Sequence, residues 1–280
     1  MFSNKMLTRL IIPLVVEQFL AMTVGVADTV MITSVGEAAV SGVALVDTIN
    51  NLVIQILTAL ATGGAVVTSQ YLGKRERQNA RTAAKQLVYT VTLFSILLMA
   101  IALVFRQPLL RFIFGSIEEE VMQNAQTYFW ICALSYPALA IYNAIAALYR
   151  SMGNSKISML ISLLMNVVNI GGNAILIYIF NWGTAGAATA SLVSRVVSAV
   201  VMLVLIRDHH NVIFLDNLLK FEYRPQMVKS ILKIGIPNGL EADPPVLQAQ
   251  ALNGLRNRFD KAGRAARLRG AVKADNLICL

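Results

Sequence analysis

Long apolar segments recur along this chain, and they constrain its fold more than any other feature. A helix needs roughly 20 consecutive apolar residues to cross a bilayer. The chain has 280 residues, of which 56% are hydrophobic and only 14% charged, with a mean hydropathy of +0.63. A soluble protein of this size needs more charge to cover its surface, so we predict an all-α, polytopic membrane protein. The expected spans lie near residues 8–32, 42–72, 86–105, 125–149, 157–180 and 186–206, with a seventh apolar start at 231–240.

Composition divides the chain into four parts. Residues 1–206 hold a six-helix bundle, 207–230 form an expected cytoplasmic linker, and 231–241 begin a seventh helix. Residues 242–280 are basic and start with adjacent prolines, so this segment cannot continue the seventh span. We interpret it as a non-membrane tail from a frameshifted, fused or truncated end. The alternative is a cytoplasmic amphipathic helix that lies on anionic lipid.

The basic residues of the short connections predict the orientation. The first and fifth expected loops contain no Lys or Arg. The second loop carries five basic residues, namely Lys74, Arg75, Arg77, Arg81 and Lys85. By the positive-inside rule, the N-terminus and the even-numbered loops are cytoplasmic. Basic residues in the cytoplasmic loops account for the net charge of +9. We therefore expect the chain to contact the lipid bilayer and not to bind nucleic acid.

The chain has no pattern typical of an enzyme. It lacks a phosphate-binding Gly-Lys motif and the His/Cys spacing of a metal site. Cys132 lies inside an expected span and Cys279 is almost terminal, so they predict neither a disulfide framework nor a metal centre. We expect no catalytic residue, no metal and no cofactor.

Two carboxylates interrupt the first apolar run, "IIPLVVEQFLAMTVGVADTVMI". A carboxylate near the bilayer centre costs on the order of 3 kcal/mol, so it usually faces a protein interior or a wet cavity. Glu17 and Asp28 are eleven residues apart, about three helical turns, which places them at nearly the same azimuth. Both should face one space, where a carboxylate can carry a proton or hold a cation. The alternative is that these acids only pack helices together.

The fifth and second spans carry further polar side chains. Asn166, Asn169 and Asn173 follow one another at spacings of three and four, which places three amides on one helical stripe. Their carbonyl oxygens can bind a hard cation; the alternative is interhelical hydrogen bonding without an ion. In the second span Asp47 begins a similar stripe with Asn50, Asn51 and Gln55. Asp47 lies near the outer end and could instead face lipid headgroups.

Pro13 removes a backbone hydrogen bond inside the first span, which predicts either a helix that bends or a static kink. The first span begins "LIIPLVVE" and the seventh begins "KIGIPNGLE". Each places Glu four residues after Pro, at Glu17 and at Glu241. This match falls where the second copy of a six-span repeat would begin.

Four stretches, in this order, resemble bacterial multidrug and toxic compound extrusion (MATE) transporters. They are "IPLVVEQFLAMTVGVADTVMI", "ATGGAVVTSQYLGKRERQNARTAAKQ", "ALYRSMGNSKISMLISLLMNVVNI" and "GTAGAATASLVSR". The resemblance covers roughly residues 5–241 and is to the N-terminal lobe. It implies half of a twelve-helix, two-lobe transporter in the bacterial inner (plasma) membrane. It also implies the export of organic cations or drugs in exchange for protons or sodium.

The resemblance assigns roles to individual residues. Asp28 matches the first-helix aspartate of the family's N-lobe cation site, and Pro13 matches a proline associated with bending of that helix. Asn169 and Ser191 match polar positions of the fifth and sixth helices. Asn173 falls where many relatives have an aspartate, which puts a two-carboxylate sodium site in doubt. The remaining candidates for a cavity or gate are Glu17, Asp47 and Glu241, the last at the acidic position that begins the C-lobe.

Two competing functions stay open. A flippase for lipid-linked sugars of the same superfamily would line its cavity with several basic residues to meet a phosphate. Here the basic residues gather at membrane ends while Asp28 lies deep, which favours cationic cargo. The chain could also be a non-transporting membrane fragment, because the second lobe is missing. A homodimer with both copies in the same orientation could supply that lobe.

Overall fold

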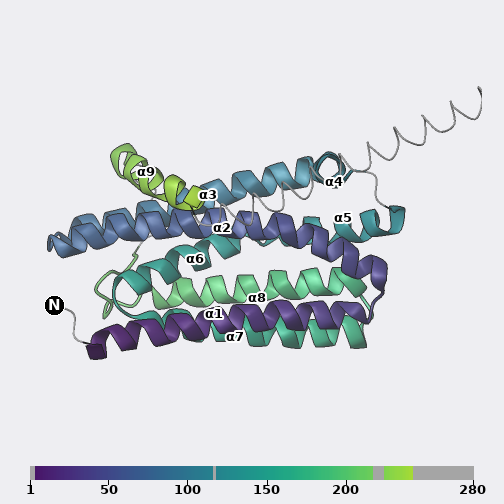
Figure 1. The fold of residues 1–280 in the computed structure, drawn as a ribbon. Helices are drawn as coiled ribbons and strands as arrows, with labels where there is room; N and C mark the ends of the chain where they lie inside the picture. The colour runs from purple at the N-terminus through teal and green to yellow at the C-terminus, as the bar shows by residue number, and fades with distance from the viewer. Residues whose placement is uncertain (1–3, 116–117, 217–223, 242–280) are drawn as a thin grey trace, which may run out of the picture. The chain divides into compact units, whose positions relative to one another are not determined.

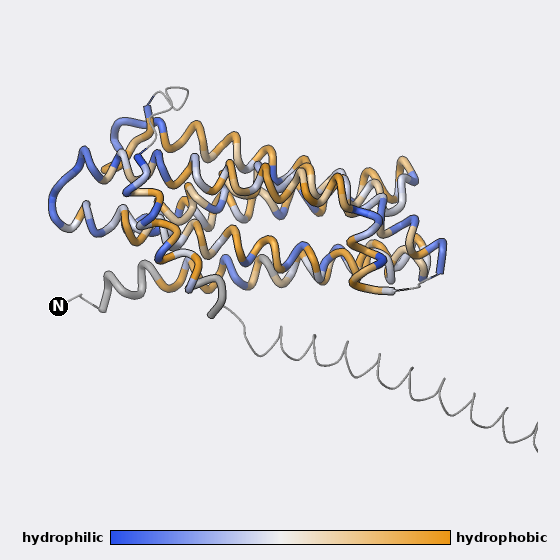
Figure 2. Tube along the Cα trace, turned by 90° about the horizontal axis from the view of Figure 1, so that it is seen from above, coloured by the Kyte–Doolittle hydropathy of each residue, from blue (hydrophilic) through white to orange (hydrophobic). Residues whose placement is uncertain are grey.

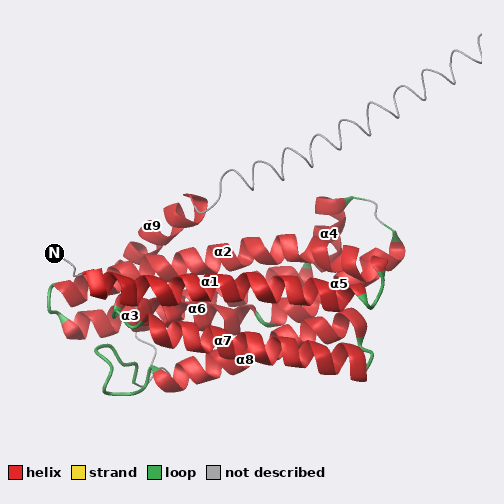
Figure 3. Ribbon diagram, turned by 60° about the horizontal axis from the view of Figure 1, so that its bottom comes forward, coloured by secondary structure: helices red, strands yellow, loops and turns green. Residues whose placement is uncertain are grey.

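The computed structural model describes residues 4–115, 118–216 and 224–241, and this part of the chain is helical with no strand. Residues up to Gly239 form one compact unit; of the second unit, Leu240–Leu280, only the two residues that end the last helix are described. The prediction of an all-α polytopic bundle is confirmed. Short loops join most of the helices, and a longer connection leads from α8 to α9 (Figure 3). The elements are α1 (Asn4–Thr33), α2 (Glu37–Gly73), α3 (Arg77–Val104), α4 (Arg106–Phe114), α5 (Glu119–Leu134), α6 (Tyr136–Ser151), α7 (Ser155–Asn173), the π-helical η1 (Ala174–Ile179), α8 (Gly183–Leu205) and α9 (Pro225–Glu241).

Five of the described helices are long and apolar enough to cross a membrane, and the α5–α6 pair adds a sixth if it counts as one span. Hydrophilic residues gather at the two ends of the bundle and apolar residues along its length (Figure 2). Two boundaries differ from expectation. The short helix α4 was not predicted, and α9 begins at Pro225, so the expected linker over 207–230 is partly helical.

The span predicted near residues 125–149 consists of two helices instead of one. It is broken at Ser135 into α5 and α6, which are bent by 47° relative to each other. Pro137 lies in the first turn of α6 and has no N–H to continue the helical hydrogen bonds of α5. The Ser135 hydroxyl instead donates to the Cys132 carbonyl at 2.6 Å. The break therefore leaves Ser135 at a bend inside the bundle.

The helices pack in two groups, which are joined where α5 and α6 pack against α8 (Figure 1). In one group α7 packs between α1 and α8, and in the other α2 packs against α3 and α5. A tight turn with Gly153 at φ 78° connects α6 to α7. That backbone conformation suits glycine, which lacks a Cβ. The turn brings the end of α6 next to the start of α7, where part of the candidate site lies.

Gly42 allows α2 and α5 to approach closely, and we expect Gly42→Ala to destabilise the bundle by about 1–3 kcal/mol. An added Cβ would lie 2.9 Å from the Ala125 nitrogen and 3.0 Å from the Val121 oxygen, backbone atoms that cannot move independently. Gly171→Ala is the matched control, because a Cβ there has no neighbour within 4 Å. Thermal unfolding in detergent, followed by circular dichroism, measures the difference. Equal melting temperatures for both variants would contradict this prediction.

Candidate ion-binding site

A chain of hydrogen bonds joins α1, α7 and α8. The Asn173 amide donates to Asp28 Oδ1 at 2.5 Å and to Asn169 Oδ1 at 3.3 Å. The Asn169 amide in turn donates to the Ser191 hydroxyl at 3.1 Å. The structure therefore brings together the four residues that the sequence predicts for ion coupling.

The cluster formed by Asp28, Asn169, Asn173 and Ser191 contains carboxylate, amide and hydroxyl oxygens. Asn173, Asn169 and Ser191 are buried, with 0%, 5% and 7% of their surfaces exposed. The Asn173 Oδ1 atom is buried and has no hydrogen-bond partner among the described residues. Leaving a buried acceptor unsatisfied costs free energy, and a cation can supply the missing interaction. Carboxylate, amide and hydroxyl oxygens are ligands that hard cations accept, so the donor set fits such an ion. The π-helical η1 begins directly after Asn173, and π-helical segments are frequent at functional sites.

Asp47 lies inside the bundle rather than among headgroups. It is half-buried on α2, with Asn50 and Tyr128 as hydrogen-bonding neighbours. Asn50 also accepts a hydrogen bond of 2.8 Å from the Tyr136 hydroxyl. The Asp47 charge acts on the Asp28 carboxylate. The predicted stripe on α2 is incomplete, however, because Asn51 is exposed.

Arg195 is a functional candidate that the sequence analysis missed. It lies in the middle of α8, and its guanidinium donates to the Ser135 hydroxyl at 2.6 Å, at the break between α5 and α6. Its charge acts on both Asp28 and Asp47. The expectation that basic residues gather only at membrane ends is therefore wrong. A single arginine inside the apolar segment "SLVSRVVSAVV" was the signal that could have revealed it.

Glu17 forms a second polar cluster with α6 and α7. One carboxylate oxygen accepts a hydrogen bond from Arg150 at 3.2 Å and one from the Tyr142 hydroxyl at 3.4 Å. The other accepts from the Ser158 hydroxyl at 2.9 Å. Glu17 and Asp28 both bond to α7, so the prediction that they face the same side of α1 is confirmed.

The other predicted residues lie outside these two clusters or beyond the described side chains. Pro13 is buried within α1, which runs as one helix through it. Glu241 is the last residue of α9, and its side chain lies outside the described residues. Asn166 is buried on α7, but its amide nitrogen has no partner among the described residues.

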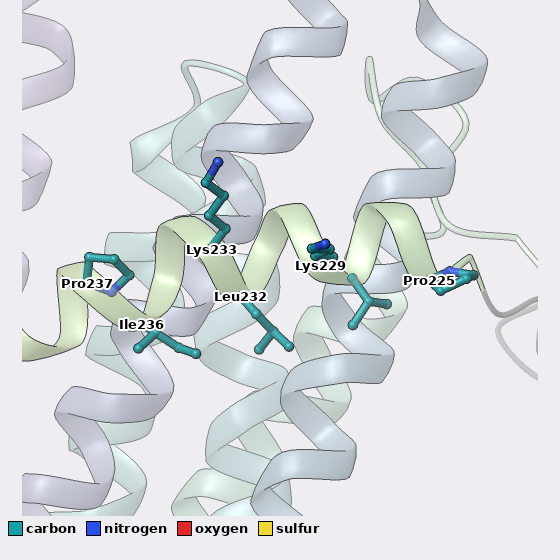
Figure 4. A pocket seen from close by; sticks show the side chains of 7 residues that line it. Pro225, Lys229, Leu232, Lys233, Ile236 and Pro237 are labelled. Atoms are coloured by element: carbon teal, nitrogen blue, oxygen red, sulfur yellow. The ribbon is translucent and has the colours of Figure 1, made fainter.

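Two surface pockets of the described residues lie on other parts of the bundle. One runs along α9, where Lys233 points away from Leu232 and Ile236 (Figure 4). An apolar groove of about 530 Å³ lies between α3 and α9. Neither pocket is lined by a residue of the Asp28 or Glu17 clusters.

Known proteins with similar sequences identify the family of this chain. The family model MatE matches residues 13–175, more than half of the chain. The chain belongs to the MatE family. The uncharacterized transporter YisQ of Bacillus subtilis is 29% identical over 235 residues, which are 82% of this chain and 50% of YisQ. A probable multidrug resistance protein NorM of Thermotoga maritima is 26% identical over 242 residues, 85% of this chain and 51% of that protein.

Solved MatE-family structures share the fold. A crystal structure described as MATE in the bent conformation aligns with a TM-score of 0.78 at 21% identity, over 85% of this chain and 52% of that one. An outward-facing MATE family transporter of the MOP superfamily aligns with the same TM-score of 0.78 and 21% identity, over 84% and 52%. The chain thus spans about half the length of the relatives it matches. It is a multi-pass membrane protein of the MatE family.

Proposed function

We propose that this chain is the N-terminal lobe of an antiporter that exports organic cations or drugs in exchange for protons or sodium. Asp28 is the ion-coupling acid, and Asn169, Asn173 and Ser191 supply further oxygen ligands. The observation that carries the proposal is the hydrogen-bonded Asp28–Asn173 pair with its unsatisfied buried Asn173 oxygen. A gradient of the coupling ion can drive export only if the ion binds one cavity state more tightly than the other.

The proposed setting is the inner membrane of a bacterium with the N-terminus in the cytoplasm. The start of α1, the α2–α3 turn and the α6–α7 turn share one end of the bundle (Figure 1). Lys74, Arg75 and Arg150 lie at that end, which the positive-inside rule assigns to the cytoplasm. The second lobe comes from a further segment or a second copy of this chain. The chain has no catalytic role in this proposal.

Equilibrium binding by the purified 280-residue chain tests this function. We expect saturable binding of tetraphenylphosphonium, an organic cation, in isothermal titration calorimetry. Added sodium or protons should weaken that binding by competing for the carboxylate. Proton release in weak buffer would identify protons as the coupling ion, and ²²Na⁺ retention would identify sodium. A folded chain that binds neither the organic cation nor a coupling ion would overturn the proposal.

Arg195 gives the flippase alternative one specific observation in its favour. A guanidinium inside the bundle can meet the phosphate of a lipid-linked sugar. The two carboxylates of Asp28 and Asp47 carry more negative charge than Arg195 carries positive charge, which favours a cation at this place. Binding of an undecaprenyl diphosphate in place of tetraphenylphosphonium, under the same conditions, would support the flippase instead.

A further inference from the structure

The buried face of α7 is polar along nearly its whole length. Six of its seven buried residues carry hydroxyl or amide side chains: Ser155, Ser158, Ser162, Asn166, Asn169 and Asn173. Apolar residues lie on the opposite face, where Leu160 is 54% exposed and Val167 61% exposed. A helix that turns its polar stripe inward and its apolar side chains outward suits a bilayer and lines a polar interior.

This polar face connects the two carboxylates of α1. Ser158 bonds to Glu17 at one end, and Asn173 bonds to Asp28 at the other. Ser162 is a hydrogen-bonding neighbour of Tyr142, which itself donates to Glu17. Eleven residues of helix separate the two acids, a rise of roughly 16 Å. Polar groups therefore continue from one carboxylate to the other without an intervening apolar layer on α7.

Two buried amide groups without hydrogen-bond partners among the described residues lie where the hydrogen bonds along the polar face of α7 are interrupted. The amide nitrogens of Asn166 on α7 and Asn143 on α6 are buried and have no partner among the described residues. Both side chains are more than nine-tenths buried, with 7% and 8% of their surfaces exposed. Buried polar groups without a protein partner are usually satisfied by internal water. Asn166 lies between Ser162 and Asn169, so such water would bridge the gap between the two clusters.

A resident positive charge lies at the Glu17 end. Arg150 pairs with Glu17 at 3.2 Å and also donates to Ser158 at 3.1 Å. The side chains of Arg150 and Glu17 are 25% and 18% exposed, so this pair lies at the surface of the described bundle. A guanidinium compensates the Glu17 charge when no other cation is present.

We propose that the inward face of α7 is a hydrated path for the coupling ion between Asp28 and Glu17, and that Arg150 closes it by occupying Glu17. The proposal rests on the proposed function, because it assumes that Asp28 exchanges an ion. A cation that moves along the path reaches Glu17 and displaces the guanidinium. Glu17 is thus a second ion site, in the N-terminal half of α1.

Cysteine reactivity tests whether this face is wet. Ser162→Cys is made in the 280-residue chain whose two cysteines are replaced by Cys132→Ala and Cys279→Ala. The probe is the small cationic thiol reagent 2-aminoethyl methanethiosulfonate, and mass spectrometry follows the modification. Ser198→Cys is the matched control, because Ser198 is fully buried on α8 and bonds only to its own helix. We expect Ser162→Cys to react at least about tenfold faster than Ser198→Cys.

Removing the resident cation should open the path further. Arg150→Gln, combined with Ser162→Cys, is expected to increase the rate for the cationic reagent several-fold and leave the Ser198→Cys rate unchanged. If Ser162→Cys and a second probe, Asn166→Cys, react as slowly as Ser198→Cys in folded protein, the path does not exist. If Arg150→Gln leaves the rate unchanged, Arg150 does not close it. Reactivity is measured without cation binding, so a dry α7 face would leave the Asp28 site standing, and failed cation binding would not alter these rates.

Discussion

Asp28→Asn is expected to reduce cation binding by this chain on the order of a hundredfold or more. Asparagine has nearly the same volume, so the helix contact between α1 and α7 is preserved while the negative charge is lost. Interactions with ionised groups are roughly twice as strong as neutral ones, and a neutral amide offers a cation only one carbonyl oxygen. The measurement is the calorimetric titration with tetraphenylphosphonium, repeated with sodium.

The control for this charge change is Asp208→Asn. Asp208 lies after α8 and its side chain is 55% exposed, beside His210. It should bind cations as the original chain does. Undiminished binding by Asp28→Asn, in protein that elutes as a single folded species, would show that another acid holds the cation.

Arg195→Gln is expected to change cation binding in the opposite direction and to tighten it about tenfold. With all groups ionised, Asp28, Asp47 and Arg195 carry one net negative charge, and the substitution raises this to two. Glutamine keeps an amide donor at this position but is shorter than arginine, so the hydrogen bond to the Ser135 hydroxyl is weakened or lost together with the charge. The same titration measures the affinity, and Arg195→Lys, which keeps the charge, is the matched control.

A loss of cation affinity in Arg195→Gln would indicate that the guanidinium positions the site rather than opposing the cation. The double variant Asp28→Asn with Arg195→Gln separates these cases further. If the arginine acts by charge on Asp28, its removal should tighten binding less when Asp28 is already neutral.

Local sequence patterns predicted which polar residues share a helix face, whereas Ser191 and the ion-coupling role of Asp28 came from the family resemblance. The eleven-residue spacing of Glu17 and Asp28 fixed their common side of α1, because helical geometry depends only on the interval between residues. The amide spacing on α7 likewise placed Asn169 and Asn173 on one buried stripe. Both predictions concern a single helix, where sequence distance translates directly into direction.

Contacts between helices could not be predicted in the same way. Arg195 approaches Asp28 and Asp47 only because α8, α1 and α2 pack together, and no local pattern in α8 specifies these neighbours. The pairing of Glu17 with Arg150 depends equally on the turn at Gly153, which sets where α6 ends relative to α7. The break at Ser135 had a local signal in Pro137, but the apolar run over 125–149 concealed it.

The attachment of α1 to its neighbours has a mechanical consequence. Only 6% of its apolar window is buried within the described part of the chain. Among its described side chains, the hydrogen bonds from other helices are accepted by two carboxylates, one in each half of the span Ile11–Thr33. The exposed side chains of α1 contribute little to its attachment, so packing against α7 and the two carboxylates hold the helix in place. On the proposed function, an ion bound at either carboxylate would replace hydrogen bonds that attach α1 to α6 and α7, and the attachment of this helix would then depend on ion occupancy.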